Sequence, residues 1–140
     1  MKISARNQLK GTISNVQEGA VNGVVTIDLG GNQVKADITM DAIEQLGLTE
    51  GKEAFAIIKA TSVMFAAGTE KLAGLSARNQ LAGKVVEVKK GAVNGHVTLE
   101  VGGNRIKGSI TNEAIDQLGL AEGVDALAIV KSTDVMVGVE

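Results

Sequence analysis

An internal repeat dominates this sequence. The hexapeptide SARNQL occurs at residues 4–9 and again at 76–81, an offset of 76 − 4 = 72 residues. Without any insertion, the same offset superimposes GAVNG at 19–23 on 91–95, GGN at 30–32 on 102–104 and QLGL at 45–48 on 117–120. Self-similarity at a fixed offset indicates repeated structural units. We therefore expect two homologous domains, 1–66 and 75–140, joined by a linker at 67–74.

The small size of each repeat limits how the chain can be stabilised. A domain of about 65 residues has a marginal hydrophobic core, and association with further copies often compensates for this. Hydrophobic residues make up 44% of the chain but aromatic residues only 1%, so the core must be mainly aliphatic. There is no cysteine, which excludes disulfides, thiolate metal sites and a cysteine nucleophile. We expect a homo-oligomer.

The hydrophobic pattern of the first repeat predicts short strands. Residues Val24–Leu29 alternate between apolar and polar side chains, the period of a half-buried strand. Asn22 and Gly23 directly before it predict a tight hairpin turn, and Gly30–Asn32 predicts a second turn leading into another alternating strand, Val34–Ile38. Residues Ala54–Lys59 read as a buried strand.

A short helix is predicted between these strands. Thr39 can cap it, Asp41 lies in its first turn and Gly47 can end it. The second repeat copies this pattern with Thr111 as the cap and Glu113 in the first turn. About five short strands and one short helix per repeat predict a mainly β protein made of two tandem OB-like small β-barrels.

A polar cluster at the start of each repeat is the first candidate for chemistry. Ser4-Ala5-Arg6 recurs as Ser76-Ala77-Arg78. The guanidinium of arginine offers a planar fork of donors suited to oxyanions, and serine adds a hydroxyl donor. The alternative interpretation is a surface ion pair beside a structural asparagine, and recent duplication could also have preserved the motif.

Two further stretches could bring donors to a barrel rim. Lys59-Ala60-Thr61 and Lys131-Ser132-Thr133 each follow the last predicted strand, although a lysine there is commonly just a solvated strand end. The GAVNG stretches at 19–23 and 91–95 read as hairpin turns, whose backbone N–H groups can also form a concave anion nest.

Catalysis finds little support in the sequence. His96 is the only histidine, and its counterpart in the first repeat is Val24, so we interpret it as a surface residue. Asp41 and Glu44 are explained as charges near a helix N-terminus rather than an acid–base pair. The glycine pairs lack the context of a nucleotide-binding loop. We expect no catalytic residues, no bare metal cation and no cofactor.

Charge and hydropathy restrict the partners and the location. The net charge is −2, and a strand-binding OB barrel would need a basic groove and aromatic platforms, which two phenylalanines cannot supply. Charge and composition thus argue against nucleic-acid binding. That function, or another ligand-binding role of an OB fold, is kept as the alternative. The polar N-terminus and the lack of a long apolar run predict a cytoplasmic protein that does not contact membranes.

The combination of SARNQL, the glycine at position 11, GAVNG, GGN and a final K-[AS]-T resembles the molybdate-binding Mop domain over nearly the whole of each repeat. Two copies in one short chain resemble the tandem, di-Mop molbindins. The resemblance implies OB-like barrels assembled around a threefold axis, which for a duplicated chain means a homotrimer. It also implies intracellular binding, storage and homeostasis of molybdate, or of the near-isostere tungstate, at interfaces between Mop domains.

The resemblance implies the following ligand-binding residues. The main oxyanion site matches Ser4, Ala5, Arg6, Lys59 and Ala60 in the first repeat and Ser76, Ala77, Arg78, Lys131 and Ser132 in the second. A second oxyanion site near the symmetry axis matches Gly19, Ala20, Val21 and Asn22, with Gly91, Ala92, Val93 and Asn94.

The repeats differ at two positions near these sites. Ala60 stands against Ser132, which removes a hydroxyl donor from the first repeat, and Val24 stands against His96. Sites lined by the two repeats therefore need not be equivalent.

Overall fold

A computed structural model describes all residues 1–140. The first repeat contributes β1 (Asn7–Glu18), β2 (Asn22–Asp28), β3 (Gln33–Thr39), α1 (Met40–Gln45), β4 (Glu53–Ile58), the 3-10 turn η1 (Ala60–Ser62) and β5 (Met64–Ala67). The second contributes β6 (Asn79–Lys90), β7 (Asn94–Val101), β8 (Asn104–Thr111), α2 (Asn112–Leu118), β9 (Asp125–Val130), η2 (Ser132–Asp134) and β10 (Met136–Gly138). The expected mainly β architecture, with one short helix per repeat, is confirmed.

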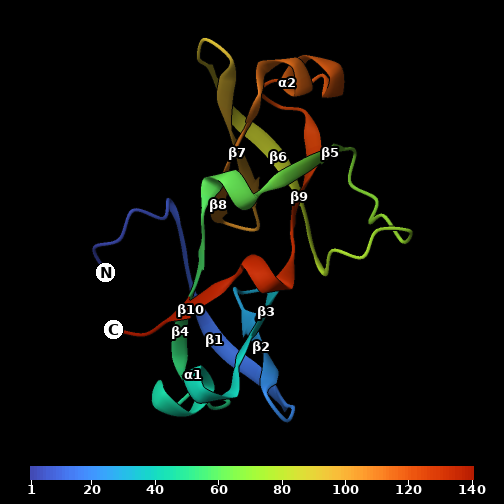
Figure 1. Cartoon of the computed structure of the whole chain (residues 1–140). Coiled ribbons are helices and arrows are strands. Elements are labelled where there is room, and N and C mark those ends of the chain that lie inside the picture. The colour runs from blue at the N-terminus through green and yellow to red at the C-terminus, as the bar shows by residue number, and fades with distance from the viewer.

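The last strand of each repeat lies in the sheet of the other repeat. One antiparallel sheet has the order β10-β4-β1-β2-β3, and the other has the order β5-β9-β6-β7-β8. We call the first sheet with α1 the first lobe, and the second sheet with α2 the second lobe. Figure 1 shows the chain passing between the lobes twice, before β5 and before β10, with the two helices at opposite ends of the molecule. This exchange of strands was not predicted from the sequence.

Glycine allows the first strand of each lobe to curl. β1 pairs with β4 from Asn7 to Thr12 and with β2 from Thr12 to Glu18, and a bulge interrupts the second ladder. A Cβ atom on Gly11 would lie 2.4 Å from the carbonyl oxygen of Asp28. The backbones can approach this closely only without a side chain, a role that glycine commonly has where a barrel strand bends sharply.

The predicted hairpin turn at Asn22-Gly23 is wrong. Both residues belong to β2, neither has a positive φ, and the turn lies just before them. Gly23 is needed for packing instead, because a Cβ there would lie 2.7 Å from the terminal methyl of Ile43 in α1. Gly23 thus allows α1 to pack close against β2.

The predicted helix boundaries are confirmed. The hydroxyl of Thr39 accepts a hydrogen bond from the N–H of Ala42 at 3.1 Å, and Thr111 caps α2 in the same way. Gly47 and Gly119 follow the helices with φ of +62° and +64°, a left-handed conformation that favours glycine.

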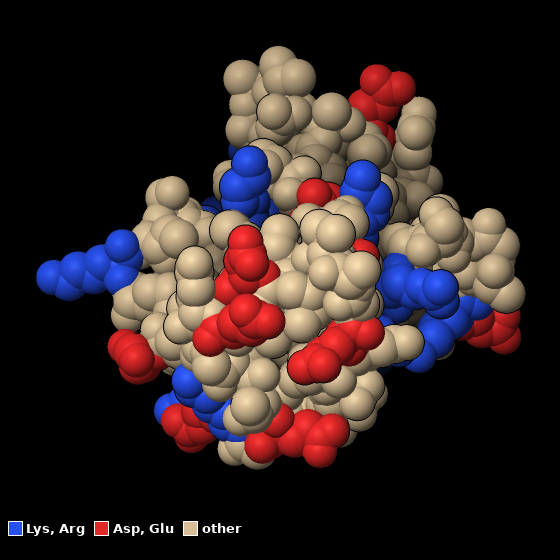
Figure 2. Space-filling view, turned by 60° about the horizontal axis from the view of Figure 1, so that its bottom comes forward, with Lys and Arg blue, Asp and Glu red and all other residues tan.

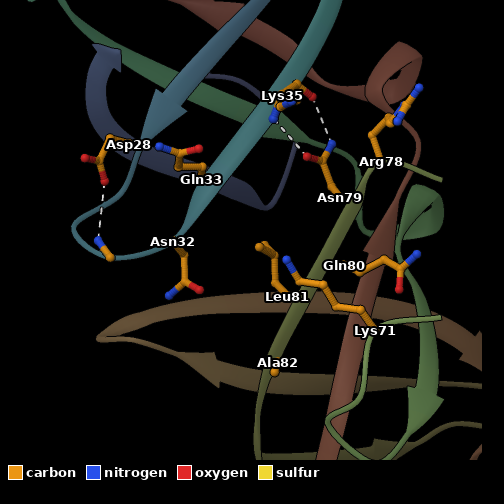
Figure 3. Close-up of a pocket in the computed structure, with 11 residues that line it drawn as sticks. Asp28, Asn32, Gln33, Lys35, Lys71, Arg78, Asn79, Gln80, Leu81 and Ala82 are labelled. Carbon is orange, nitrogen blue, oxygen red and sulfur yellow. Dashed lines mark hydrogen bonds between the residues drawn. The ribbon is translucent and has the colours of Figure 1, made fainter. Parts of the chain in front are cut away.

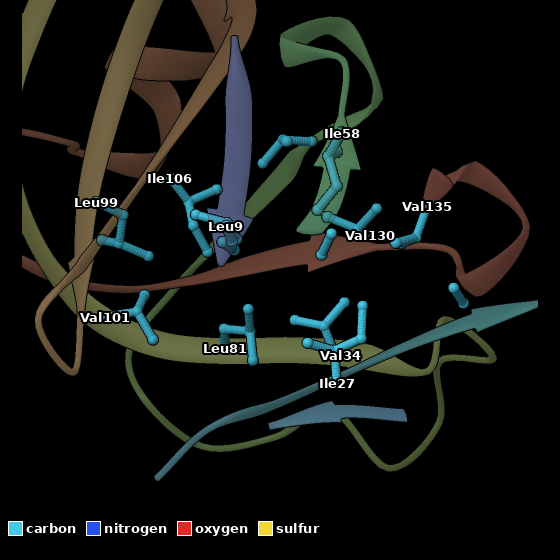
Figure 4. Packing of buried hydrophobic residues seen from close by; sticks show 14 of the residues in the cluster. Leu9, Ile27, Val34, Ile58, Leu81, Leu99, Val101, Ile106, Val130 and Val135 are labelled. Carbon is cyan, nitrogen blue, oxygen red and sulfur yellow. The ribbon is translucent and has the colours of Figure 1, made fainter. Parts of the chain in front are cut away.

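A single hydrophobic core runs through both lobes. Its 25 buried residues form one contiguous cluster drawn from both repeats. Figure 4 shows Leu9 and Ile58 of the first repeat close to Leu81 and Val130 of the second. The two repeats therefore form one packed body rather than two independent domains.

Two buried asparagine side chains join the lobes. The amide of Asn7 donates to the carbonyl of Lys107 and accepts from its N–H, both at 2.8 Å. Asn79 forms the same pair of hydrogen bonds with Lys35, at 2.9 and 2.8 Å (Figure 3). Each amide therefore pairs with the edge strand, β8 or β3, in the way that one residue of an added strand would. We call these two contacts the asparagine clamps.

The packing of the exchanged strand β5 provides a test of the fold. A Cβ on Gly108 would lie 2.4 Å from the ring of Phe65, whereas the corresponding residues of the other lobe are Ala36 and Val137. We expect Gly108→Ala to lower the free energy of unfolding by about 1–3 kcal/mol through overpacking. Phe65→Val in the same chain should recover much of that loss, because it makes the pair match the other lobe. Denaturant unfolding of both single variants and the double variant measures this coupling, and strictly additive effects would contradict it.

Candidate functional site

The structure brings the two predicted oxyanion-binding stretches of the first repeat together. The N-terminal segment before β1 and the turn η1 after β4 line one cavity of about 250 Å³, at the boundary with the second lobe. Its lining residues are Ser4, Ala5, Arg6, Lys59, Ala60 and Thr61, with His96 and Ser109 from β7 and β8. Every residue predicted for this site in the first repeat lines the cavity.

The cations of this cavity lack acidic partners. Arg6 donates from Nε to the main-chain carbonyl of Ser4 at 3.1 Å and from Nη2 to that of Ile3 at 3.3 Å. Four ion pairs occur in the structure, and none includes Arg6 or Lys59. The interpretation of Arg6 as part of a surface ion pair is therefore wrong, while that of a structural asparagine at the next position is correct.

Charge and hydrogen-bond donors dominate the lining of this cavity. Arg6 and Lys59 contribute cationic donors, and Ser4, Thr61 and Ser109 contribute hydroxyls. No aspartate or glutamate is among its lining residues. Such a set suits a fully deprotonated oxyanion, because charge-assisted hydrogen bonds to an anion are the strong ones.

Sequence reasoning missed the contribution of the second lobe. His96 is exposed, as expected, yet it lines the cavity. It pairs in register with Ser109 on the neighbouring strand β8, and Ser109 lines the same cavity. No local signal could have placed these residues beside Arg6, because that placement depends on how the two lobes pack.

The corresponding residues of the second repeat lie in different surroundings. Arg78 lines a cavity of about 570 Å³ together with Lys35, Lys71 and Asp28, and Figure 3 shows it beside the clamp of Asn79. Lys131 and the segment η2 do not line that cavity, although η2 packs against β3. Ser76 is exposed and Ala77 is half-buried at the start of the same stretch.

The residues of the predicted second oxyanion site form the turns between β1 and β2 and between β6 and β7. Gly19 and Asn22 line a cavity of about 260 Å³, and Glu18 and Asp37 also belong to its lining. In the other turn, the N–H of Gly91 donates to the carbonyl of Asn94 at 2.8 Å. Ala20, Val21, Ala92 and Val93 complete these exposed turns. Anion binding there stays a prediction.

The end of the molecule that carries α1 is acidic. Figure 2 looks toward this end and shows acidic side chains gathered over it. The exposed residues Asp41, Glu44 and Glu50 lie on α1 and on the turn after it. Around α2, in contrast, Asp116 is paired with Lys90. The acidic residues at the α2 end are the corresponding Glu113, Asp116 and Glu122, so the two ends differ chiefly by the lysine that is paired with Asp116.

Clusters of metal ligands and membrane-spanning helices are absent from the structure. No group of three or more histidine, cysteine, aspartate or glutamate side chains is placed to hold a metal ion. None of the helices is long and apolar enough to cross a membrane.

Known proteins similar to this chain carry names that refer to molybdenum or molybdate. The Azotobacter vinelandii molybdenum transport protein ModE is 42% identical over 99% of this chain and 52% of its own length. The Rhodobacter capsulatus molybdenum-pterin-binding protein MopA is 41% identical over 97% of this chain and 52% of its own length. The chain thus spans about half the length of these curated relatives.

A solved structure matches the whole chain. The structure of the cytoplasmic molybdate-binding protein ModG with molybdate bound has a TM-score of 0.94 and 44% identity, and each chain is fully covered. The two lobes, including their exchanged strands, therefore have a counterpart of known structure.

A family model describes both repeats. The TOBE domain model matches residues 3–65 and again residues 75–137. These matches cover most of the chain, and they confirm the resemblance to tandem Mop domains. The chain belongs to the TOBE domain family, with two Mop-type domains in tandem.

Proposed function

We propose that this protein binds molybdate, and tungstate as its near isostere, for storage and homeostasis of the oxyanion in the cytoplasm. The observation that carries the proposal is the cavity in which Ser4, Arg6 and Lys59 meet residues of the other lobe. Both cations there lack an acidic partner, so an anion would neutralise charge that the protein leaves uncompensated. The protein acts in this proposal as a binding protein rather than an enzyme, and its ligand is the oxyanion alone.

The chemistry of the cavity supports selectivity for such an anion. A lining without a carboxylate offers no strong acceptor for the proton of hydrogen phosphate, so it favours molybdate, which is fully deprotonated at neutral pH. Sulfate has the same charge and shape but is smaller, so the size of the cavity must provide the discrimination. The molybdate bound in ModG and the names of the relatives support the same ligand class.

A homotrimer is the proposed assembly. Val21 and Val93, at the two hairpin turns, are 74% and 70% exposed, which is unusual for aliphatic side chains at the tips of two equivalent turns. Burying both turns against other copies would remove this apolar surface from water. It would also bring the predicted second oxyanion site, Gly19–Asn22 and Gly91–Asn94, near its copies at a symmetry axis.

Isothermal titration of the dialysed protein with molybdate tests the proposal. We expect tight binding that persists in a large excess of sulfate, and a light-scattering mass of three chains. Tungstate should compete with molybdate for the same sites. Absence of binding by protein shown to be folded and oligomeric would overturn the proposed function and leave a duplicated β-barrel protein of another purpose.

A further inference from the structure

We infer that the two copies of the main oxyanion site are not equivalent, and that the first binds a dianion much more tightly than the second. This inference rests on the proposed function. The first site comprises Ser4–Arg6 and Lys59–Thr61, and the second site comprises the residues 72 positions later, Ser76–Arg78 and Lys131–Thr133. The two sets are nearly identical, so the difference comes from the surfaces that face them.

A row of donors faces the first site. In the second lobe, Lys89 of β6 pairs in register with His96 of β7, and His96 pairs with Ser109 of β8. Directly paired residues project to the same face of an antiparallel sheet. His96 and Ser109 line the cavity of the first site, so this row presents an imidazole and a hydroxyl to the anion with an ammonium group behind them.

The corresponding row in the first lobe has a different character. There, Gln17 pairs with Val24, and Val24 pairs with Asp37. Asp37 belongs to β3, which packs against η2 of the second site as β8 packs against η1 of the first. One carboxylate oxygen of Asp37 is buried and has no hydrogen-bond donor, so it adds negative charge that no neighbour compensates.

The neighbouring charged residues also differ between the two sites. Near the first site, Arg6 shares a cavity of about 230 Å³ with Arg105, Lys107 and Glu87. The counterparts of these last three residues are Gln33, Lys35 and Asn15, so both sets carry the same net charge of +1, and the first site differs by having an arginine where the second has a glutamine. Within the turns, Asp134 of η2 replaces Ser62 of η1.

Repulsion explains why the second site should be the weaker one. The hydroxyl of Ser132 gives it one donor that Ala60 does not provide. However, Asp37 and Asp134 place two carboxylates at the second site, where the first site has Ser109 and Ser62. Like charges close to a binding site cost far more than one neutral hydrogen bond contributes.

Exchanging residues between the two rows tests the inference on the full-length protein with molybdate. We expect Ser109→Asp to weaken the tight class of sites by about tenfold or more, and Asp37→Ser to strengthen the weak class by a similar factor. His96→Val should weaken the tight class by a smaller factor. Crystals soaked with about one tungstate per chain should show the anomalous signal of tungsten at the first site.

The outcomes separate this inference from the proposed function. If the wild-type protein binds no molybdate, the proposed function fails. If it binds molybdate but Asp37→Ser and Ser109→Asp leave both affinities unchanged, or tungsten fills both sites equally, only the inequality of the sites is wrong. Far-UV circular dichroism and molar mass show that each variant keeps the fold and assembly on which its measurement depends.

Discussion

Replacing Asn7 by alanine is expected to lower the free energy of unfolding by about 3 kcal/mol. The Asn7 side chain is 2% exposed, and its amide satisfies both the N–H and the carbonyl of Lys107. Alanine would remove two hydrogen bonds and leave two main-chain groups unpaired at the boundary between the lobes. Asn79→Ala should have a comparable effect on Lys35, because the second asparagine clamp has the same geometry.

Chemical denaturation followed by circular dichroism measures these effects. Asn15→Ala is the matched control, because Asn15 is exposed in the bulge of β1 and its side chain forms no hydrogen bond within the protein. If Asn7→Ala unfolds at the same denaturant concentration as Asn15→Ala, the clamp does not stabilise the contact between the lobes.

The double variant Arg6→Ala/Lys59→Ala should weaken binding of molybdate at the first site by about a hundredfold or more, since each charged hydrogen bond contributes roughly 1.5–3 kcal/mol. Both cations line the same cavity and lack acidic partners, so their removal takes away attraction without freeing a carboxylate. Titration calorimetry gives the affinity.

A control must lose the same charge elsewhere. Lys2→Ala/Lys71→Ala removes two exposed cations that form no ion pair and do not line this cavity, so its effect on the first site reports the general electrostatic attraction alone. Equal losses of affinity in the two double variants would mean that Arg6 and Lys59 act only through overall charge and do not contact the anion.

Local features of the fold were predictable from the sequence. The alternation in β2 and β3, the cap at Thr39 and the left-handed glycine at Gly47 depend on residues close in the chain, and the structure has all of them. The turn at Asn22-Gly23 was mispredicted because tertiary packing decided the outcome. The helix needed a glycine beneath Ile43, and that requirement placed Gly23 inside a strand.

The candidate site was predictable in its donors but not in its surroundings. Repetition of SARNQL and of K-[AS]-T identified the residues that meet in the cavity. The facing surfaces, with Ser109 on one side and Asp37 on the other, follow from the strand register and from the contact between lobes. The contact between the lobes joins Ser109 to Ser4–Arg6 and β3 to η2, which are far apart in the chain, so no local pattern of a single sequence reveals it.

The exchange of β5 and β10 makes the covalent link between the repeats redundant for holding them together. A protease cut within residues 68–74 would leave two fragments, each with its last strand still inserted in the sheet of the other. The fragments should remain associated and separate only when both sheets open. By the same logic, a chain carrying one repeat would have to take its fifth strand from a second copy, so two repeats are the smallest unit that completes both sheets, whether or not a peptide bond joins them.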